Sequence, residues 1–357
     1  MIDDILHLAK ELISVPSVTG IPEELTQVLK VAEKYLEGQE FTAFASNNIP
    51  SLLYSNKGKD LKEFKIILNA HLDVVPAKKE QFNPHEKGGK LYGRGAYDMK
   101  AAGAVMMYLF KEIGAELPYP LGLQLVTDEE SGGRDGTKYQ IDQKIRAEFA
   151  IAGEGTNFRI INENKSIMDI KLVAQGKRAH SAYPWLGKNA ILHLYEALSR
   201  ITELYPTPKE ETFETTVSIA RVESNNRSHN IVPEDCTAYL NFRFTKEEED
   251  TIVPRLRSIL PEDITLEVIH KDIPHSSSPE GFYLSGLRQA AEDVLKTNVP
   301  LARAHGASDT RYFRNADCDA VEFGPVGHGH HSDEEWADIK SLEYYYKILK
   351  NFLLSLK

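Results

Sequence analysis

The chain has 357 residues, of which 41% are hydrophobic and 27% are charged, a composition typical of a globular protein with about two domains. Its formal net charge of −11 argues against nucleic acid or an anionic membrane surface as the main partner, because both are polyanions. Two cysteines, Cys236 and Cys318, are too few for a disulfide framework or a thiolate zinc site, and the lack of any long apolar run predicts no membrane span and no signal peptide, hence a cytoplasmic protein.

Up to about residue 165 the sequence alternates predicted helices with predicted strands. Apolar residues at helical spacing predict helices over residues 3–12, 22–36 and 99–113, and apolar runs of strand length predict strands over 64–68, 121–126 and 147–152. Strands that alternate with helices are typical of the α/β class, and here they predict a doubly wound, mostly parallel sheet.

From about residue 166 the pattern changes. Alternation with period two predicts strands over 166–174, 217–222 and 237–244, with a helix over 190–204. We therefore expect an inserted α+β domain with an antiparallel sheet over residues 166–281. The segment 274–279 is interpreted as the linker that returns to the first domain, which comprises residues 1–165 and 282–357 and ends with helices over 282–295 and 342–354.

The run Asn69-Ala70-His71-Leu72-Asp73-Val74-Val75-Pro76 places a histidine and a carboxylate at the end of a predicted strand. Side chains two residues apart share one face of a strand, so Asp73 can hydrogen-bond one ring nitrogen of His71 while the other nitrogen binds a metal. A His-x-Asp sequence is common, so this interpretation depends on further ligands elsewhere in the chain.

Acidic residues at the ends of predicted elements supply those ligands. Asp98 comes immediately before a predicted helix, where capping is the ordinary role of an aspartate, and Glu129 and Glu130 follow a strand, where a surface turn is the ordinary interpretation. Glu154 follows the next strand between two glycines. Since the carboxyl ends of parallel strands converge on one crevice, these carboxylates and His71 predict a site for Zn²⁺, Co²⁺ or Mn²⁺. One bridging carboxylate would allow two ions and leave Glu129 free as a base.

Two motifs resemble the signatures of the M20 family of metallohydrolases: His71-Leu72-Asp73-Val74-Val75-Pro76, and Lys90-Leu91-Tyr92-Gly93-Arg94-Gly95-Ala96-Tyr97-Asp98-Met99-Lys100. This family includes acetylornithine deacetylase, succinyl-diaminopimelate desuccinylase, aminoacylase, and related carboxypeptidases and dipeptidases. The resemblance extends over nearly the whole chain. It implies that the first domain is catalytic and that the inserted domain is a lid and dimerisation domain.

The resemblance also implies a ligand set. His71, Asp98 and Glu154 would bind one ion, and Asp98, Glu130 and a C-terminal histidine would bind the other, with a cis peptide bond after the bridging Asp98. Glu129 resembles the general base, and Asp73 the residue that orients His71. The cofactor is expected to be two divalent cations, with Zn²⁺ first and Co²⁺ or Mn²⁺ as alternatives.

The C-terminal ligand has to be chosen among three histidines, His328, His330 and His331. His331 stands at the family's spacing after Gly324-Pro325-Val326 and is followed by the usual downstream pattern, Glu335-Trp336. We therefore expect His331 to be the ligand, with His330 as the second choice.

In the inserted domain, Arg178-Ala179-His180-Ser181-Ala182-Tyr183-Pro184 resembles the family's lid motif. The resemblance implies that His180 crosses the interface of a homodimer formed through the lid and polarises the scissile carbonyl in the neighbouring subunit. Tyr183, Asn230 and Arg243 match lid positions expected to meet substrate, although a sheet-face ion pair is an equal interpretation of Arg243.

A loop after the insert completes the expected substrate site. Ser308-Asp309-Thr310-Arg311-Tyr312-Phe313 resembles a loop that holds the carboxylate end of the substrate, with Gly306 and Ser308 as the binding residues. The desuccinylases usually carry Gly-Arg-Arg-Gly before the lid and a threonine in this loop, where the present chain has Asn162-Glu163-Asn164-Lys165 and Ala307. Both departures remove groups suited to a second substrate carboxylate.

The expected activity is therefore metal-dependent hydrolysis of an N-acyl amino acid or short peptide with a free carboxylate. Bound cations make a nucleophilic water available near neutral pH, and Glu129 would take its proton. A dedicated carboxypeptidase or dipeptidase, or a succinyl-diaminopimelate desuccinylase, is the alternative within enzymes. A metal-binding protein without catalysis is a more distant alternative, which the complete ligand set and Glu129 disfavour.

Overall fold

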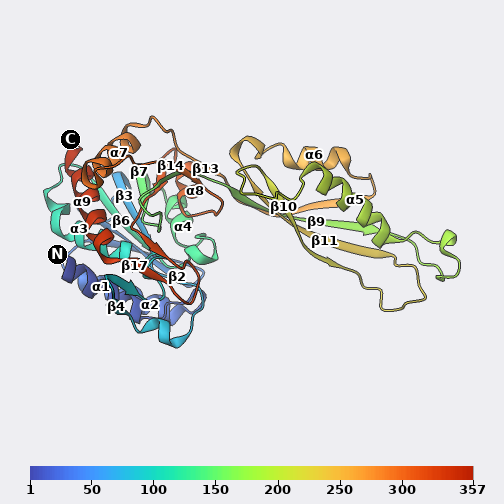
Figure 1. Ribbon diagram of the computed structural model, residues 1–357, viewed down its shortest axis with the longest axis horizontal. Coiled ribbons are helices and arrows are strands. Elements are labelled where there is room, and N and C mark those ends of the chain that lie inside the picture. Colours follow the sequence, from blue (N-terminus) through green and yellow to red (C-terminus); the bar gives the residue numbers. More distant parts are fainter. Residues whose placement is uncertain (357) are drawn as a thin grey trace. The chain divides into compact units, whose positions relative to one another are not determined.

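The computed structural model describes residues 1–356, which fold into two compact units (Figure 1). The first unit contains Met1–Glu163, Ser276–Arg303 and the chain from Ser308 onward, and the second contains Asn164–His275 and Ala304–Ala307. The catalytic and lid roles expected for residues 1–165 with 282–357 and for residues 166–281 stay predictions.

The helices are α1 (Ile2–Ser14), α2 (Pro22–Tyr35), α3 (Lys100–Ile113), α4 (Thr137–Asp142), α5 (Ala190–Leu204), α6 (Ile252–Ile259), α7 (Phe282–Leu295), α8 (Thr310–Phe313) and α9 (Ile339–Ser355). The strands are β1 (Phe41–Ser46), β2 (Ile49–Ser55), β3 (Glu63–His71), β4 (His85–Lys87), β5 (Lys90–Tyr92), β6 (Leu121–Val126), β7 (Arg146–Ala152), β8 (Ile160–Asn164), β9 (Ser166–Gln175), β10 (Thr216–Glu223), β11 (Asp235–Phe244), β12 (Ile264–Lys271), β13 (His275–Ser276), β14 (Leu301–Ala304), β15 (Asp319–Glu322), β16 (Gly327–His328) and β17 (Trp336–Asp338).

A large mixed sheet forms the centre of the first unit, with strand order β1-β2-β6-β3-β7-β15-β8-β13. The neighbours β6, β3, β7 and β15 run parallel, while β1, β2 and β8 pair antiparallel with their neighbours. Ile66, Ile67 and Leu68 of β3 are completely buried, as expected for a parallel strand that is covered on both faces. The predicted α/β class with a mostly parallel sheet is confirmed.

Helices cover both faces of this sheet. On one face α1, α3, α7 and α9 pack together, and Phe110, Phe149 and Phe352 belong to the hydrophobic core beneath them (Figure 1). A second core, which includes Phe64 and Phe313, lies under α4 and α8 on the other face. Two cores separated by one sheet are what a doubly wound fold requires.

The second unit is a small α+β structure of its own. Its sheet is antiparallel with the order β10-β11-β9-β12, and α5 and α6 lie along the same side of it (Figure 1). In β11 the side chains of Leu240, Phe242 and Phe244 are buried, and those of Tyr239 and Arg243 are half-buried, so only one face contributes to the core. The predicted alternation is confirmed.

Several elements differ from the expectation. Residues 274–279, expected to be a linker, contain strand β13, whose neighbour in the sheet is β8. Ser277 next to it donates its hydroxyl to the carbonyl of Ala320 in β15 at 2.7 Å, which attaches this segment to the sheet. The short strands β4, β5, β16 and β17 form a separate sheet in the order β16-β17-β5-β4, which was not predicted. Within residues 1–356 we find no helix with the length and apolar character needed to cross a bilayer.

Candidate metal centre

The parallel strands bring the predicted ligands to one edge of the central sheet. His71 is the last residue of β3, while Glu129 and Glu130 lie in a single turn of 3-10 helix directly after β6. Glu154 follows β7, and Asp98 precedes α3 by two residues. Because β6, β3 and β7 are neighbours, the residues that follow them meet at the carboxyl edge of the sheet.

Asp98 occupies the middle of the group. One carboxylate oxygen, Oδ1, lies 3.0 Å from Nε2 of His71, and the other, Oδ2, lies 2.6 Å from Nε2 of His330 and 3.1 Å from Nε2 of His331. The peptide bond between Asp98 and Met99 is cis, as predicted. Oδ1 of this buried carboxylate therefore faces His71, while Oδ2 faces His330 and His331.

A second carboxylate stands beside each set. Oε2 of Glu154 lies 3.7 Å from Nε2 of His71, and Oε2 of Glu130 lies 3.0 Å from Nε2 of His331. The structure thus brings together every predicted ligand and adds His330, which the sequence offered only as a second choice. The role of these residues as ligands stays a prediction.

Asp73 makes contacts other than the expected one. Nδ1 of His71 lies 3.0 Å from the main-chain oxygen of Asp73 but 3.5 Å from its carboxylate, so the carbonyl is the closer partner. The Asp73 carboxylate accepts hydrogen bonds from Thr19 Oγ1 at 2.8 Å and from the backbone amides of Glu129 and Glu130 at 3.2 and 3.1 Å. Asp73 therefore fixes the turn that presents Glu129 and Glu130.

Glu335 plays a comparable part for Asp98. Its carboxylate accepts hydrogen bonds from the backbone amides of Gly95, Tyr97 and Asp98 at 2.8–3.1 Å and forms an ion pair with Arg94 at 2.6 Å. In the sequence, Glu335 stands out only as part of the pattern after His331. Its burial against the glycine-rich loop, whose amides need an acceptor, is seen only in the structure.

Electrostatics in the group reflect crowded buried acids. Burial, aided by the charges of Glu154, Asp309 and Asp98, raises the pKa of Glu129 well above its usual range, and burial together with Asp98 raises the pKa of Glu130 to about 7. Burial alone would lower the pKa of His71, but Glu154, Asp73 and Asp98 raise it well above its usual range. Burial would raise the pKa of Asp98, yet hydrogen bonds from the three histidines hold it well below that of a free aspartate.

These observations fit divalent cations. Carboxylate oxygens and imidazole nitrogens are donors that Zn²⁺, Co²⁺ and Mn²⁺ accept. Two groups that share Asp98, one with His71 and Glu154 and the other with His330 and His331, each have three such atoms within 4.8 Å of one another. Oε1 of Glu154 is buried, and the described residues offer it no hydrogen-bond partner. A bound cation would stabilise the ionised forms of Glu129 and Glu130, whose pKa values are raised by burial first and by neighbouring acids second.

The predicted lid residues belong to the second unit. His180 is exposed, and its Nδ1 accepts a hydrogen bond from the amide of Ala182 at 3.1 Å, while its ring lies 5.9 Å from that of Tyr183. The carbonyl of Asn230 accepts from the amide of Ser181 at 2.9 Å, so His180 and Asn230 are held by adjacent backbone. Arg243 extends from β11 on the half-buried face of the sheet.

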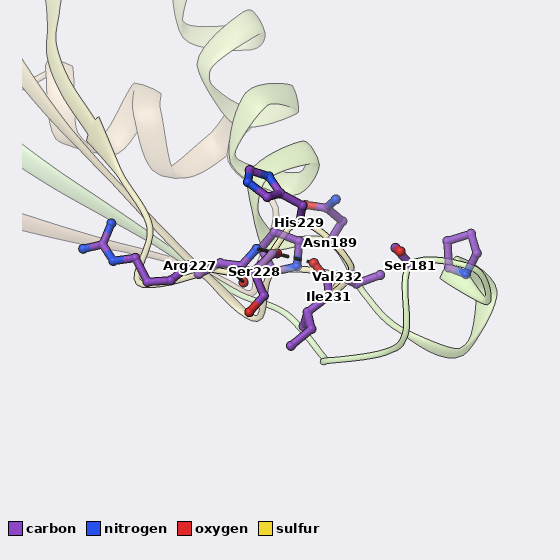
Figure 2. Close-up of a pocket in the computed structure, with 10 residues that line it drawn as sticks. Ser181, Asn189, Arg227, Ser228, His229, Ile231 and Val232 are labelled. Atoms are coloured by element: carbon purple, nitrogen blue, oxygen red, sulfur yellow. Dashed lines mark hydrogen bonds between the residues drawn. The ribbon is translucent and has the colours of Figure 1, made fainter.

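A pocket of about 600 Å³ lies beside this part of the second unit (Figure 2). Two segments form it: one runs from Ser181 to Asn189, and the other from Asn226 to Pro233. Figure 2 shows His229 and Ser228 above and beside Ile231 in the second segment. The pocket thus adjoins the backbone that holds His180 and Asn230.

The remaining predicted substrate residues lie in the loop before α8. Gly306 is part of the second unit, where its carbonyl accepts from Nδ2 of Asn164 at 3.1 Å, whereas Ser308 is part of the first. Ser308 is buried, and its hydroxyl lies 2.7 Å from that of Thr310. Their contact with substrate stays a prediction.

The first unit is thus a doubly wound α/β structure with imidazoles and carboxylates gathered at the carboxyl edge of its sheet, the arrangement of a candidate metal centre. The model of peptidase family M20/M25/M40 matches residues 67–355, and the chain belongs to this family. It is therefore a metal-dependent amide hydrolase.

Named relatives cover nearly the whole chain. It is 27% identical to the succinyl-diaminopimelate desuccinylase of Rickettsia akari (strain Hartford), over 98% of this chain and 99% of the relative. It is 28% identical to the enzyme of that name from Methylibium petroleiphilum, over 98% and 97% of the two chains.

Solved structures share the fold. Aminopeptidase PepT from Bacillus cereus ATCC 10987 superposes with a TM-score of 0.81 at 18% identity, covering 99% of this chain and 98% of the other. The M20 family metallo-carboxypeptidase Sso-CP2 from Sulfolobus solfataricus superposes with a TM-score of 0.75 at 19% identity, covering 98% of both chains. Because each similarity covers at least 98% of this chain, the shared fold includes both units.

Proposed function

We propose that this chain hydrolyses the amide bond of an N-acyl amino acid or short peptide with a free carboxylate, using two divalent cations, Zn²⁺ in the first place. One observation supports the number of cations above all. Asp98 places one oxygen 3.0 Å from His71 and the other 3.1 Å from His331, so a single carboxylate lies between two sets of ligands. His71 and Glu154 would complete one ligand set, and Glu130 and His331 the other.

The residues around the cations would divide the work. Bound cations would polarise the substrate carbonyl and make water acidic enough to supply a nucleophile near neutral pH. Glu129 would accept the proton from the attacking water and pass it to the leaving amine, since it stands beside the ligands and is not one of them. Asp73 would hold the amides of Glu129 and Glu130, and the carbonyl of Asp73 would keep the ring of His71 in one orientation.

A homodimer formed through the second unit is part of the proposal. Trp185 is 74% exposed, and on α5 Leu192 and Tyr195 are 64% and 68% exposed, which is unusual for large apolar side chains. Strand β10 is an edge of the second unit's sheet, and an edge strand can pair with the same strand of a second copy. In such a dimer His180 would hold the carbonyl oxygen of a substrate bound in the partner. A cytoplasmic location stays a prediction from the sequence.

Succinyl-diaminopimelate is the second candidate substrate, because the curated relatives with similar length are named for its hydrolysis. The structure gives structural roles to two residues that replace the usual Gly-Arg-Arg-Gly run. Nδ2 of Asn162 donates to the carbonyl of Ser277 at 3.0 Å, and Nζ of Lys165 donates to the carbonyl of Thr212 at 3.0 Å. We therefore place N-acyl amino acids and short peptides first.

A hydrolysis panel tests the proposed function. Protein stripped with a chelator and then reloaded with Zn²⁺, Co²⁺ or Mn²⁺ should release amine from at least one substrate in a set of N-acetyl amino acids, dipeptides and succinyl-diaminopimelate. The stripped protein should be inactive. Failure of every metal-loaded form to cleave any member would refute the proposal, and preference for succinyl-diaminopimelate would replace the first substrate class with the second.

A further inference from the structure

Two consecutive histidines reach the same carboxylate oxygen. Nε2 of His330 lies 2.6 Å and Nε2 of His331 lies 3.1 Å from Oδ2 of Asp98, and the two rings stand at 88° with their centroids 4.2 Å apart. In an extended strand, neighbouring side chains would point to opposite faces. Here Gly329 (φ +85°) and His331 (φ +57°) both adopt left-handed backbone conformations, and this turn brings the two imidazoles to one side.

The backbone conformation of this turn depends on glycine. A Cβ on Gly329 would lie 2.5 Å from the carbonyl oxygen of Glu334, so no larger residue fits there without a shift of the backbone. His331, by contrast, accepts a left-handed conformation that non-glycine residues rarely adopt. The sequence Gly329-His330-His331 is therefore built to present two imidazoles together.

Tyr97 fixes the first of these imidazoles from the side. Its ring meets His330 edge to face at 6.5 Å, and its hydroxyl donates to the carbonyl of Gly155 at 2.7 Å. A Cβ on Gly155 or Gly327 would lie 2.3 or 2.2 Å from the Tyr97 ring, so the ring fills a space that exists because both positions are glycine. His330 is thus held against a ring that is itself fixed on two sides.

The group formed by Asp98, His330 and His331 is compact enough to bind one ion. Oδ2 of Asp98 lies 2.6 Å from Nε2 of His330 and 3.1 Å from Nε2 of His331, and two ligand atoms about 2.0–2.2 Å from one ion are separated by at most roughly 4.4 Å. The side chains of His330 and His331 are 58% and 46% exposed, so the group is open to solvent and substrate. Glu130, 3.0 Å from Nε2 of His331, adds a fourth donor.

A simpler role for His330 would be to donate a hydrogen bond to Asp98. That role would place a proton between Nε2 of His330 and Oδ2 of Asp98, the oxygen that also faces His331. Oδ2 would then accept a hydrogen bond on the side where a cation would bind. An Asp98 that bridges two cations needs both of its oxygens free of protons on their metal-facing sides.

We infer that His330 is a second histidine ligand of the cation held by Asp98, Glu130 and His331. This inference rests on the proposed function only for the presence of a cation. The two ion sites then differ: one has two imidazoles and the other, at His71 and Glu154, has one. Since imidazole favours zinc and cobalt over manganese more than carboxylate does, the two-histidine site takes Zn²⁺ or Co²⁺ first.

Metal titration of the full chain tests this without any substrate. Apo protein is titrated with Co²⁺, and binding constants are taken from calorimetry while the visible absorption bands report the coordination of each ion. His330→Ala should weaken one of the two binding events at least about a hundredfold, beyond the 10–100-fold typical of residues that only orient a ligand, and should alter its cobalt spectrum. The other binding event should not change.

Two further variants separate ligation from hydrogen bonding and from unfolding. His330→Gln keeps a donor near the position of Nε2 and would restore binding if His330 only donated to Asp98, but it should stay as weak as His330→Ala if His330 is a ligand. His328→Ala, in a neighbouring exposed histidine that packs on Trp336, is the matched control and should leave both constants unchanged. Thermal unfolding of the apo forms establishes that each variant is folded.

The inference is overturned by an unchanged cobalt spectrum in His330→Ala, by a loss smaller than a hundredfold, or by rescue in His330→Gln. It can fail separately from the proposed function. Wild-type protein that binds two ions and cleaves no member of the substrate panel would refute the proposed function and leave the ligand assignment of His330 standing. Active wild-type protein, together with a His330→Ala titration that equals the wild-type one, would refute the ligand assignment and leave the proposed function standing.

Discussion

The carboxylate of Glu335 accepts a hydrogen bond from the backbone amide of Asp98 at 3.0 Å and thereby holds the residue on which both predicted ion sites depend. The same carboxylate accepts hydrogen bonds from the amides of Gly95 and Tyr97 and forms an ion pair with buried Arg94. One side chain, which lies 237 residues after Asp98 in the sequence, thus organises the glycine-rich loop before α3. Since Glu335 comes four residues after His331, it connects this loop to the segment that carries the C-terminal histidines.

We predict that Glu335→Gln destabilises the apo protein by about 3–5 kcal/mol, because it leaves Arg94 buried without its ion pair. A glutamine amide would also direct a donor at backbone amides that are donors themselves. Urea unfolding of apo protein measures the loss, and Glu334→Gln, an exposed neighbour, is the matched control. Equal stability of the two variants would show that the loop does not need this acceptor.

Glu129→Gln is predicted to keep both metal ions and to lose activity by roughly a hundredfold to ten-thousandfold, the usual contribution of a general base. The amide is close in size to the carboxylate but cannot accept the proton from water. Metal content and kcat measured on the same preparation separate the two effects. A variant that is fully active, or that has lost its metal, would contradict the assignment of Glu129 as the base.

The sequence predicts elements well where a long apolar pattern decides them. The predicted bounds for β6 (Leu121–Val126), α5 (Ala190–Leu204) and α7 (Phe282–Leu295) coincide with the structure. The hairpin of β1 and β2 was missed, although its two-residue turn at Asn47 and Asn48 has φ of 46° and 65°, the conformation that asparagine favours in tight hairpins. An Asn-Asn turn between two short strands was therefore a usable signal.

The site shows the same division. That His71, Glu130 and Glu154 would meet follows from parallel strands, because topology alone sends their carboxyl ends to one edge. The small sheet of β4, β5, β16 and β17 could not be predicted, because strands of two or three residues have no periodicity and pair across the sequence. The convergence of His330 with His331 depends on left-handed backbone between β16 and β17, and of the two left-handed residues only Gly329 is of a type that indicates this conformation.

Acid should weaken the second unit through Asp263. Its carboxylate pairs with Lys188 and lies 2.7 Å from Nε2 of His193, and these hydrogen bonds, that of Lys188 first, lower the pKa of Asp263 from 3.8 to about 2. A pKa that is lower in the folded protein stabilises it above the unfolded value, and this contribution disappears as the pH falls from about 4 through 2. Asp263→Asn should thus be less stable than wild type at pH 7.

Acid titrations of unfolding, followed by circular dichroism, measure this effect, with Glu262→Gln as the neighbouring control. The difference between wild type and Asp263→Asn should shrink steadily below pH 4. A difference that is constant across this range would mean that Asp263 contributes through packing and not through its charge.

The exposed apolar side chains of α5 provide a test of the proposed dimer. Leu192→Glu with Tyr195→Glu places charges in the centre of that surface, so the variant should be a monomer at concentrations at which wild type is a dimer. Light scattering coupled to size exclusion measures the mass. Phe282→Glu, which changes a residue of α7 that is 74% exposed in the first unit, should leave the dimer intact. A monomeric wild-type protein would exclude the arrangement.

If His180 acts in a partner's site, two inactive variants should complement each other. In a heterodimer of His180→Ala and Glu129→Gln subunits, the first subunit keeps its own Glu129 and would receive His180 from the second. One of the two sites is then complete, so purified heterodimers carrying two different affinity tags should show about half of wild-type kcat. Each homodimer should be at least about a hundredfold slower, the usual cost of losing an oxyanion donor or a general base.

The control is a heterodimer of His180→Ala with the double variant His180→Ala, Glu129→Gln, which has no complete site. Heterodimers as slow as the homodimers would show that His180 does not act across the interface.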